Sequence, residues 1–424
     1  MDHMVSLPSI RTPQSKPASS PFRMWTDASL AEQDDGSFRL SARILCPTND
    51  TAVFPNSKAR TEYQKILAHY CPSPSFQPPS PQQSTARSFY EVVHTPDLSL
   101  KPSRSIQHPS VQTELYPFQK RAVSWLLEKE RVKVEEDGSV AEVPSAEASL
   151  PYSFHRYMDC YGQPFYASHL LGRVIRKPNE ADSLHRHLYG GILSEEMGLG
   201  KTVELIDLLC LHKRTAGLRD TVLDAYSNET VTVSSATLIV SPPAILDQWM
   251  SEIQAHAPSL KIHHYTGVKH SKNNITDILL QQDVVITTYN VLASEIHYAD
   301  EKPDRNFRHQ KKHIPRRSPL VKILWWRVCL DEAQMIESGV SSAATVARRI
   351  PRCNAWAITG TPLKKDIKDL MGLLIFLRFE PFCESGVWQN MHAYPEVFHQ
   401  IFGSIAMRHT KAQVRQELQL PPQR

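Results

Sequence analysis

Residues 190–202 read Gly-Gly-Ile-Leu-Ser-Glu-Glu-Met-Gly-Leu-Gly-Lys-Thr. A short apolar run leads into this stretch and a helical pattern leaves it, which is the strand–loop–helix context of a phosphate-binding loop. Glycines let the backbone wrap a polyphosphate with its N–H groups pointing inward. Because Glu195 replaces the first glycine of the general pattern, the stretch alone predicts either a nucleotide loop or a glycine-rich turn.

Two side chains at the end of this stretch suit phosphate chemistry. Lys201 has the reach for the β- and γ-phosphates, and the hydroxyl of Thr202 is a suitable ligand for Mg²⁺. The helix that follows adds its positive N-terminal end. The residues expected to bind the nucleotide from this loop are Glu196, Met197, Gly198, Leu199, Gly200, Lys201 and Thr202.

A second apolar run, 324–330, ends in Asp331-Glu332-Ala333-Gln334. A parallel strand that delivers two carboxylates at its C-terminal end completes an ATP site. Asp331 is expected to bind Mg²⁺, and Glu332 to orient or deprotonate the attacking water, so these two and Lys201 are the catalytic candidates. The plainer interpretation is a charged strand end before a turn.

A third motif, Ala355-Trp-Ala-Ile-Thr-Gly-Thr-Pro362, is a short strand that closes on a tight turn. Each of the three pieces is weak or moderate evidence alone. Together and in this order they favour an ATP site.

The three motifs in this order resemble those of the SWI/SNF-type ATPases, which are helicase-like DNA translocases of superfamily two. Leu115-Tyr-Pro-Phe-Gln119 is similar to the adenine-reading motif of that family, which implies that Gln119 reads adenine. Residues 237–243 and 283–289 resemble its DNA-facing motifs, and 407–411 resembles the exit from its first lobe. The DNA contacts implied by this resemblance, which covers roughly 111–424, are Ser241, Pro242, Thr287 and Thr288.

Three features resemble one branch, that of the linker-histone/PHD/RING helicase ubiquitin ligases (SHPRH-like). They are Gln334 in the acidic motif, the Trp325-Trp326 pair, and a basic insertion before it. The sequence departs from the family at Ser194-Glu195, where Ala-Asp is usual, and at Leu363-Lys-Lys365 after the third motif. The resemblance implies ATP and Mg²⁺ as cofactors, double-stranded DNA or nucleosomes as partners, a nuclear location, and ubiquitin machinery only where a RING is present.

Composition sets wider limits. The 424 residues are 41% hydrophobic, and the net charge of +4 permits nucleic-acid binding without arguing for it. The seven cysteines are scattered without a Cys-x-x-Cys pair, which predicts a reducing compartment with no zinc site and no disulfide framework. No apolar run has membrane-spanning length, so no membrane partner is expected.

The chain is expected to have two parts. Residues 1–110 are predicted to be a largely disordered, Pro/Ser-rich region with a small element at 38–70, made of a strand at 38–46 and a helix at 59–70. Residues 111–424 are predicted to be one RecA-like α/β lobe, a parallel sheet with helices on both faces. It is expected to contain two insertions, at 133–185 and at 299–320. The first is expected to be a loop to about residue 150, followed by a small hairpin at 152–175. The strands are expected at 190–194, 236–241, 283–288, 323–330 and 355–359, and helices at 118–130 and 367–377.

The basic insertion has two interpretations. Between 302 and 327 lie nine Lys/Arg residues and one acidic residue, Asp304. Such a loop either grips DNA phosphates through charge or is a solvated loop without a partner. The candidate DNA-binding residues there are Lys311, Lys312, Arg316 and Arg317.

The sequence therefore favours an ATP-binding first lobe of a DNA-dependent translocase that acts on chromatin or damaged DNA. In the family a second lobe supplies an arginine to the phosphoryl group, and it is expected to begin where this sequence stops, so enzymatic activity is left open. The alternative is a non-catalytic ATP- or DNA-binding module, and ATP turnover with and without DNA separates the two. A GTPase is disfavoured because no Asn-Lys-x-Asp element is present.

Overall fold

The computed structural model describes thirteen stretches of the chain. They are residues 25–32, 38–45, 65, 67–69, 71, 86–143, 150–159, 161–178, 189–271, 274–299, 317–336, 339–363 and 369–418. The chain divides into two compact units, one made of 1–73 with 154–181 and the other of 74–153 with 182–424.

The first unit is antiparallel. β1 (Trp25–Glu32) pairs with β2 (Phe38–Leu45), and the sequence predicted only the second of these strands. A separate three-stranded sheet consists of β5 (His155–Met158), β6 (Pro164–Ser168) and β7 (Arg173–Ile175). The hairpin expected at 152–175 is therefore confirmed, with one more strand than a hairpin has. Of the helix expected near 59–70, residues 65 and 67–69 are described and are helical.

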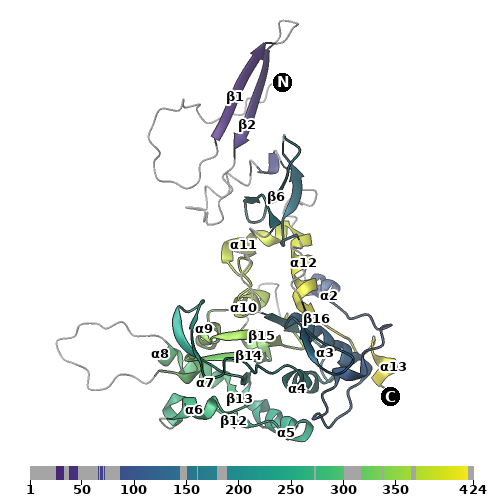
Figure 1. The fold of residues 1–424 in the computed structure, drawn as a ribbon, viewed down its shortest axis with the longest axis vertical. Helices are drawn as coiled ribbons and strands as arrows, with labels where there is room; N and C mark the ends of the chain where they lie inside the picture. The colour runs from purple at the N-terminus through teal and green to yellow at the C-terminus, as the bar shows by residue number, and fades with distance from the viewer. Residues whose placement is uncertain are drawn as a thin grey trace, which may run out of the picture. The chain divides into compact units, whose positions relative to one another are not determined.

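The second unit is built on a largely parallel sheet, which confirms the predicted α/β fold (Figure 1). β11 and β13 are buried at every residue. Strands that are covered on both faces read in sequence as nearly continuous apolar runs. The strands lie in the order β12 (Ile262–His264), β13 (Val284–Thr288), β11 (Thr237–Ser241), β14 (Ile323–Asp331), β15 (Arg352–Ile358), β8 (Tyr189–Leu193) and β16 (Ala406–Met407). The five predicted strands are present, and the short β12 and β16 were not predicted.

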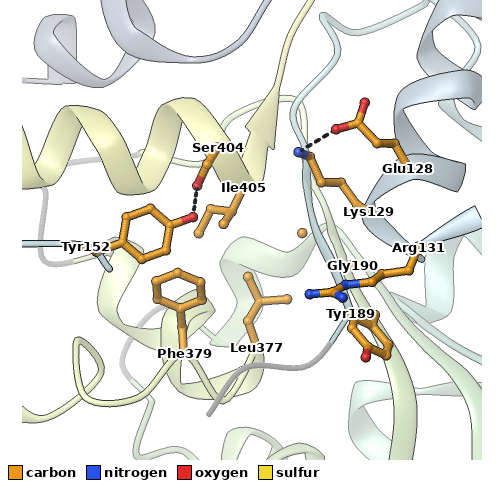
Figure 2. A pocket seen from close by; sticks show the side chains of 11 residues that line it. Glu128, Lys129, Arg131, Tyr152, Tyr189, Gly190, Leu377, Phe379, Ser404 and Ile405 are labelled. Carbon is orange, nitrogen blue, oxygen red and sulfur yellow. Dashed lines mark hydrogen bonds and ion pairs between the residues drawn. The ribbon is translucent and has the colours of Figure 1, made fainter. Parts of the chain in front are cut away.

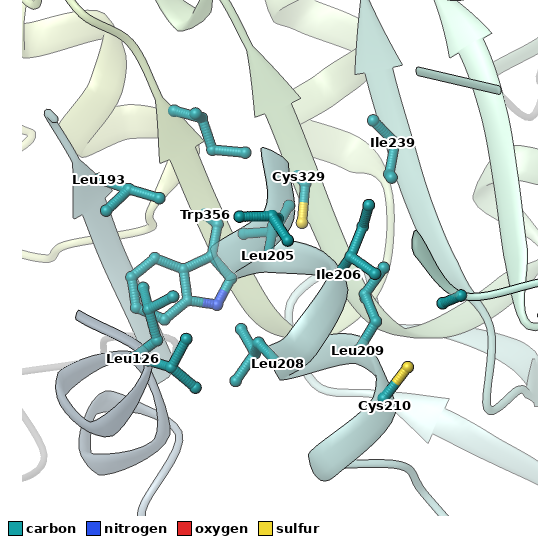
Figure 3. Close-up of a cluster of buried hydrophobic side chains, with 14 of the residues drawn as sticks. Leu126, Leu193, Leu205, Ile206, Leu208, Leu209, Cys210, Ile239, Cys329 and Trp356 are labelled. Atoms are coloured by element: carbon teal, nitrogen blue, oxygen red, sulfur yellow. The ribbon is translucent and has the colours of Figure 1, made fainter. Parts of the chain in front are cut away.

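Helices cover both faces of this sheet. On one face lie α3 (Pro117–Lys129), α4 (Lys201–Leu211) and α5 (Leu246–His256), whose apolar residues share one core with the strands. Figure 3 shows side chains of α3 and α4 beside Leu193, Cys329 and Trp356 in this core. Trp356 of β15 and Cys329 of β14 lie in that core, fully buried. On the other face lie α7 (Tyr289–Ser294), α9 (Ser342–Arg349) and α10 (Asp369–Phe376). The last of these is the buried helix expected at 367–377.

Shorter elements complete the unit. The hairpin of β9 (Thr221–Asp224) and β10 (Glu229–Val233) extends the sheet beside the start of β14. No helix in the described stretches is long and apolar enough to cross a membrane. The remaining helices are α6 (Ile275–Leu279), α8 (Ile296–Ala299), α11 (Ser385–Asn390), α12 (Pro395–Ile405) and α13 (Arg415–Leu418).

Two expectations about the start of this unit are wrong. α2 (Ala86–Val92) belongs to this unit although it precedes residue 111, where the lobe was expected to begin, because Phe89 packs on Phe402 of α12, with the ring centroids 5.4 Å apart. The loop expected from 133 contains a hairpin of β3 (Val132–Val134) and β4 (Val140–Glu142). The acidic, exposed residues between these strands concealed their pairing from the pattern.

Candidate nucleotide-binding site

The order of the strands brings the three sequence motifs together. β14, β15 and β8 are neighbours in the sheet and run parallel. The acidic pair ends β14, the Thr-Gly-Thr-Pro turn follows β15, and the glycine-rich loop follows β8. All three therefore lie at the carboxyl edge of the sheet, where open parallel sheets bind their ligands.

The loop after β8 requires glycine at two positions. Gly198 and Gly200 have φ angles of +85° and +88°, in the region that favours glycine. A Cβ atom added to Gly200 would lie 2.4 Å from Nε2 of Gln119. A side chain at position 200 would therefore displace the end of the Gln119 side chain, in addition to the strain of the positive φ; Gly200 is also the N-cap of α4.

Lys201 turns back over the loop. Its Nζ donates to the carbonyl oxygen of Glu195 at 2.9 Å. Burial lowers the pKa of Lys201, and nearby carboxylates, among them Asp331 and Glu332, oppose that effect. Because the ammonium group lies near both the loop and the acidic pair, it is placed to meet a phosphate bound between them.

The two carboxylates of the acidic motif have different surroundings. Asp331 Oδ2 accepts a hydrogen bond from the indole Nε1 of Trp249 at 2.7 Å, and Oδ1 accepts one from the backbone N–H of Glu332 at 2.9 Å. Burial raises the pKa of Asp331, and the bond from Trp249 opposes this. Glu332 has a φ of +48°, which is uncommon for a residue with a side chain. Strain of this kind clusters at functional sites.

Gln334 connects the acidic motif to the turn after β15. Its Nε2 donates to Glu332 Oε2, and its Oε1 accepts from the hydroxyl of Thr359 at 2.6 Å. Thr359 Oγ1 in turn accepts from the backbone N–H of Thr361 at 3.1 Å. The residue that suggested a branch of the family therefore forms the link between two motifs, a role that sequence reasoning missed.

The other predicted nucleotide residues lie around the same loop. Gln119 Nε2 donates to the carbonyl of Leu199 at 2.9 Å, and its Oε1 accepts from the N–H of Tyr116 at 3.0 Å. Thr202 is half-buried in the first turn of α4, and Met197 is 57% exposed. The structure thus brings the predicted loop residues, Gln119 and the acidic pair to one place.

A segment from the far end of the chain supports the loop. β16 pairs with β8, and the two residues after it continue along the loop. Glu195 and His409 are both fully buried, with Oε1 of Glu195 2.6 Å from Nδ1 of His409. Oε2 accepts from the backbone N–H of His409 at 2.8 Å. Glu195, which in sequence reads only as a missing glycine, therefore fastens the loop to this segment.

Arg408 completes that support. Its Nη1 donates to the carbonyl oxygens of Ser194 at 2.7 Å and Gly360 at 3.1 Å. One guanidinium group therefore holds the start of the glycine-rich loop against the turn after β15. The sequence pointed to this segment only through the resemblance of 407–411 to a family motif. That resemblance did not predict what the side chain of Arg408 contacts.

Of the DNA candidates at the ends of β11 and β13, two are inside the fold. The hydroxyl of Thr287 donates to the carbonyl of Tyr265 at 2.9 Å, and both Thr287 and Ser241 have no exposed surface. Both side chains are therefore covered by the fold, and their contact with DNA stays a prediction. Pro242 is half-buried, and Thr288 caps α7 through Val291.

The basic insertion is described only at its end. Arg317 forms an ion pair with Glu229 of β10, so its charge is already matched within the protein. Lys311, Lys312 and Arg316 lie outside the described residues, as do Lys364 and Lys365 after the third motif.

A cavity of about 210 Å³ lies at the other end of β8 (Figure 2). Its walls include Lys129 and Arg131 at the end of α3, and the hydroxyl of Tyr152, which is 2.7 Å from that of Ser404. Tyr189 and Gly190, at the amino end of β8, also line it. It contains none of the predicted site residues, so this cavity is not the predicted nucleotide site.

Comparison with known families decides the class of the protein. The model of the SNF2-related domain matches residues 118–424, which is more than half of the chain. The chain belongs to the SNF2-related family. This SNF2-related domain includes Gln119, the glycine-rich loop, the acidic pair and the segment 406–411.

Curated relatives agree on the branch. The SNF2-related chain is 40% identical to the mouse E3 ubiquitin-protein ligase SHPRH over 201 residues, 44% of this chain and 12% of that protein. It is 29% identical over 324 residues to the uncharacterized ATP-dependent helicase IRC20 of Saccharomyces cerevisiae, covering 67% of this chain and 20% of IRC20. It is 31% identical over 324 residues to the DNA repair protein rad8 of Schizosaccharomyces pombe, covering 72% of this chain and 26% of rad8. The SHPRH-like resemblance is confirmed, and the chain spans between 12% and 26% of the length of these relatives.

Proposed function

We propose that this chain binds ATP with Mg²⁺ at the carboxyl edge of its sheet, as the nucleotide-binding lobe of a DNA-dependent ATPase. The observation that carries the proposal is the meeting of Lys201, the Asp331–Glu332 pair and the Gln334–Thr359 bridge on adjoining strands. Phosphate, metal and attacking water need these three kinds of group at one place.

The residues present fit a magnesium ion. Each oxygen of Asp331 accepts one hydrogen bond from the protein, and a carboxylate oxygen has two lone pairs, so capacity for a cation remains. Thr202, in the first turn of α4, would supply the hydroxyl ligand. When bound, the ion would neutralise phosphate charge. Glu332, which is tied to Gln334, would orient the water.

The partner proposed for this lobe is double-stranded DNA, free or on nucleosomes, in the nucleus. The relatives include a DNA repair protein and a ubiquitin ligase, and a link to ubiquitin machinery is proposed only for a chain that also carries a RING. Pro242 and the Lys311, Lys312 and Arg316 region are the proposed contacts with the DNA backbone. Such contacts position a protein without reading sequence.

Nucleotide titration tests the first part of the proposal, that the chain binds ATP at this edge of the sheet. A fluorescent ATP analogue should bind the wild-type chain, and Lys201→Ala should weaken binding at least about tenfold, since a charge-assisted contact to phosphate is lost. Lys269→Ala, which removes an exposed lysine from the short helix 268–270, is the control for net charge. Equal binding by wild type and Lys201→Ala would sink the assigned role.

A measurement of ATP hydrolysis tests the second part of the proposal, that the lobe belongs to a DNA-dependent ATPase. Phosphate release that DNA stimulates and that Glu332→Gln abolishes supports a motor ATPase. Binding of ATP without hydrolysis, with or without DNA, supports the alternative of a non-catalytic module. Thermal unfolding of each variant confirms that it is folded.

A further inference from the structure

Lys411 lies beside the glycine-rich loop. Its backbone N–H donates to Oε2 of Glu196 at 2.8 Å. A Cβ atom added to Gly198 would lie 3.5 Å from Nζ of Lys411 and 3.6 Å from its Cε. The end of this lysine side chain therefore rests beside Gly198, in the middle of the loop.

The ammonium group of Lys411 has no ion pair and no hydrogen bond to any residue in the described stretches. Lys201 differs, because its amine is held by the carbonyl of Glu195. Two cations therefore flank the loop, one within the motif and one from a segment about two hundred positions further along the chain, and the second has an unused charge.

The position of Lys411 is fixed by the loop itself. The buried Glu195–His409 pair joins the two segments, and the N–H of Glu196 donates to the carbonyl of His409 at 3.2 Å. Phe118, Leu199 and Val414 pack together behind them. Since the main chain of Lys411 is held beside the loop by Glu196, only the lysine side chain has to become ordered for it to meet a ligand there, which limits the entropic cost of binding.

We propose that Lys411 is a second phosphate-binding cation of the nucleotide site, which contacts the α- and β-phosphates. In loops of this type the backbone N–H groups surround those two phosphates, while the motif lysine reaches the β- and γ-phosphates. Gly198 belongs to the backbone that surrounds them, so a cation beside it meets the same two groups. The inference rests on the proposed function, because it requires nucleotide at this loop.

Binding of ATP and ADP to three variants of the full chain tests the inference. Lys411→Met keeps the apolar stem and removes the charge, and it should weaken both ATP and ADP by about tenfold, the effect of one charge-assisted contact at a partly exposed position. Lys411→Arg should keep most of the affinity. Lys269→Met is the matched control and should bind as the wild type does.

The outcomes separate this inference from the proposed function. If Lys201→Ala binds poorly while Lys411→Met binds as the wild type does, the role of Lys411 is refuted and the proposed function stands. If the wild-type chain binds neither nucleotide, both are refuted. A loss confined to ATP refutes the assignment to the α- and β-phosphates. An equal loss for ATP and ADP, with an unchanged melting temperature, supports it.

Discussion

Arg327→Met removes the cation from a carboxylate that has no contact with solvent. Arg327 lies on β14, Glu130 directly follows α3, and their side chains are 1% and 0% exposed. Arg327 donates to both oxygens of Glu130, from Nε at 2.5 Å and from Nη2. His212 Nδ1 and Trp356 Nε1 lie 2.6 and 2.8 Å from the same carboxylate. The network joins the C-terminal ends of α3 and α4 to β14 and β15 of the sheet.

The structure gives the size of the effect. Burial alone raises the pKa of Glu130, yet Arg327 and His212 hold it at about 2, against an ordinary value of 4.5. At about 1.36 kcal/mol per pH unit this lowering corresponds to about 3 kcal/mol of native-state stability. Because the folded pKa is depressed, the contribution is complete above pH 4.5 and is lost as the pH falls from 4.5 toward 2. Leaving such a charge buried without its partner costs about 3–5 kcal/mol.

Urea unfolding at pH 7 measures the prediction. Arg327→Met should lower the free energy of unfolding by about 3–5 kcal/mol. The double variant with Glu130→Gln should recover part of the loss, because neither residue then leaves a buried charge. Below pH 4.5 the stability of Glu130→Gln should fall less steeply with pH than that of the wild type. If Arg327→Met unfolds within about 1 kcal/mol of the wild type, the reasoning about this charge is refuted.

Three further predictions concern the loop and the DNA surface. Gly200→Ala should cost about 1–2 kcal/mol through its positive φ, and should also weaken nucleotide binding by displacing Gln119, as thermal unfolding and titration would show; unchanged affinity would contradict the packing argument. Glu195→Ala should cost about 1–3 kcal/mol, since it leaves the N–H groups of His409 without an acceptor, and Glu195→Gln, which keeps one acceptor oxygen, should cost less; equal stability of all three chains would argue against the pair. DNA binding should be independent of sequence and weaken with salt, and replacing three basic residues by Ala should lower the log–log salt slope by up to about 3. These three are Lys311, Lys312 and Arg316. Arg317→Ala is the control and should leave the slope unchanged, because Glu229 already neutralises that charge; an unchanged slope in the triple variant would mean a solvated loop.

The sequence by itself determined five strands of the sheet and the edge at which the motifs meet. Strands covered on both faces are largely apolar, so β11, β13 and β14 were visible as runs, and the glycine-rich turn between a strand and a helix gained its meaning from the two motifs that follow it. The motifs at the ends of those runs then had to meet, because the carboxyl ends of parallel strands share one edge. Local pattern was sufficient wherever function depends on neighbours in sequence.

Only the tertiary structure decided the contacts between distant segments. The Glu195–His409 pair, the position of Lys411 and the Glu130–Arg327 network each join residues about two hundred positions apart. No periodicity or propensity couples such residues, since each lies in an element that reads normally without the other. Burial of an ionisable side chain is likewise set by what packs on it from elsewhere, which is why Glu195 looked like a departure from a motif and is instead the residue that holds the loop.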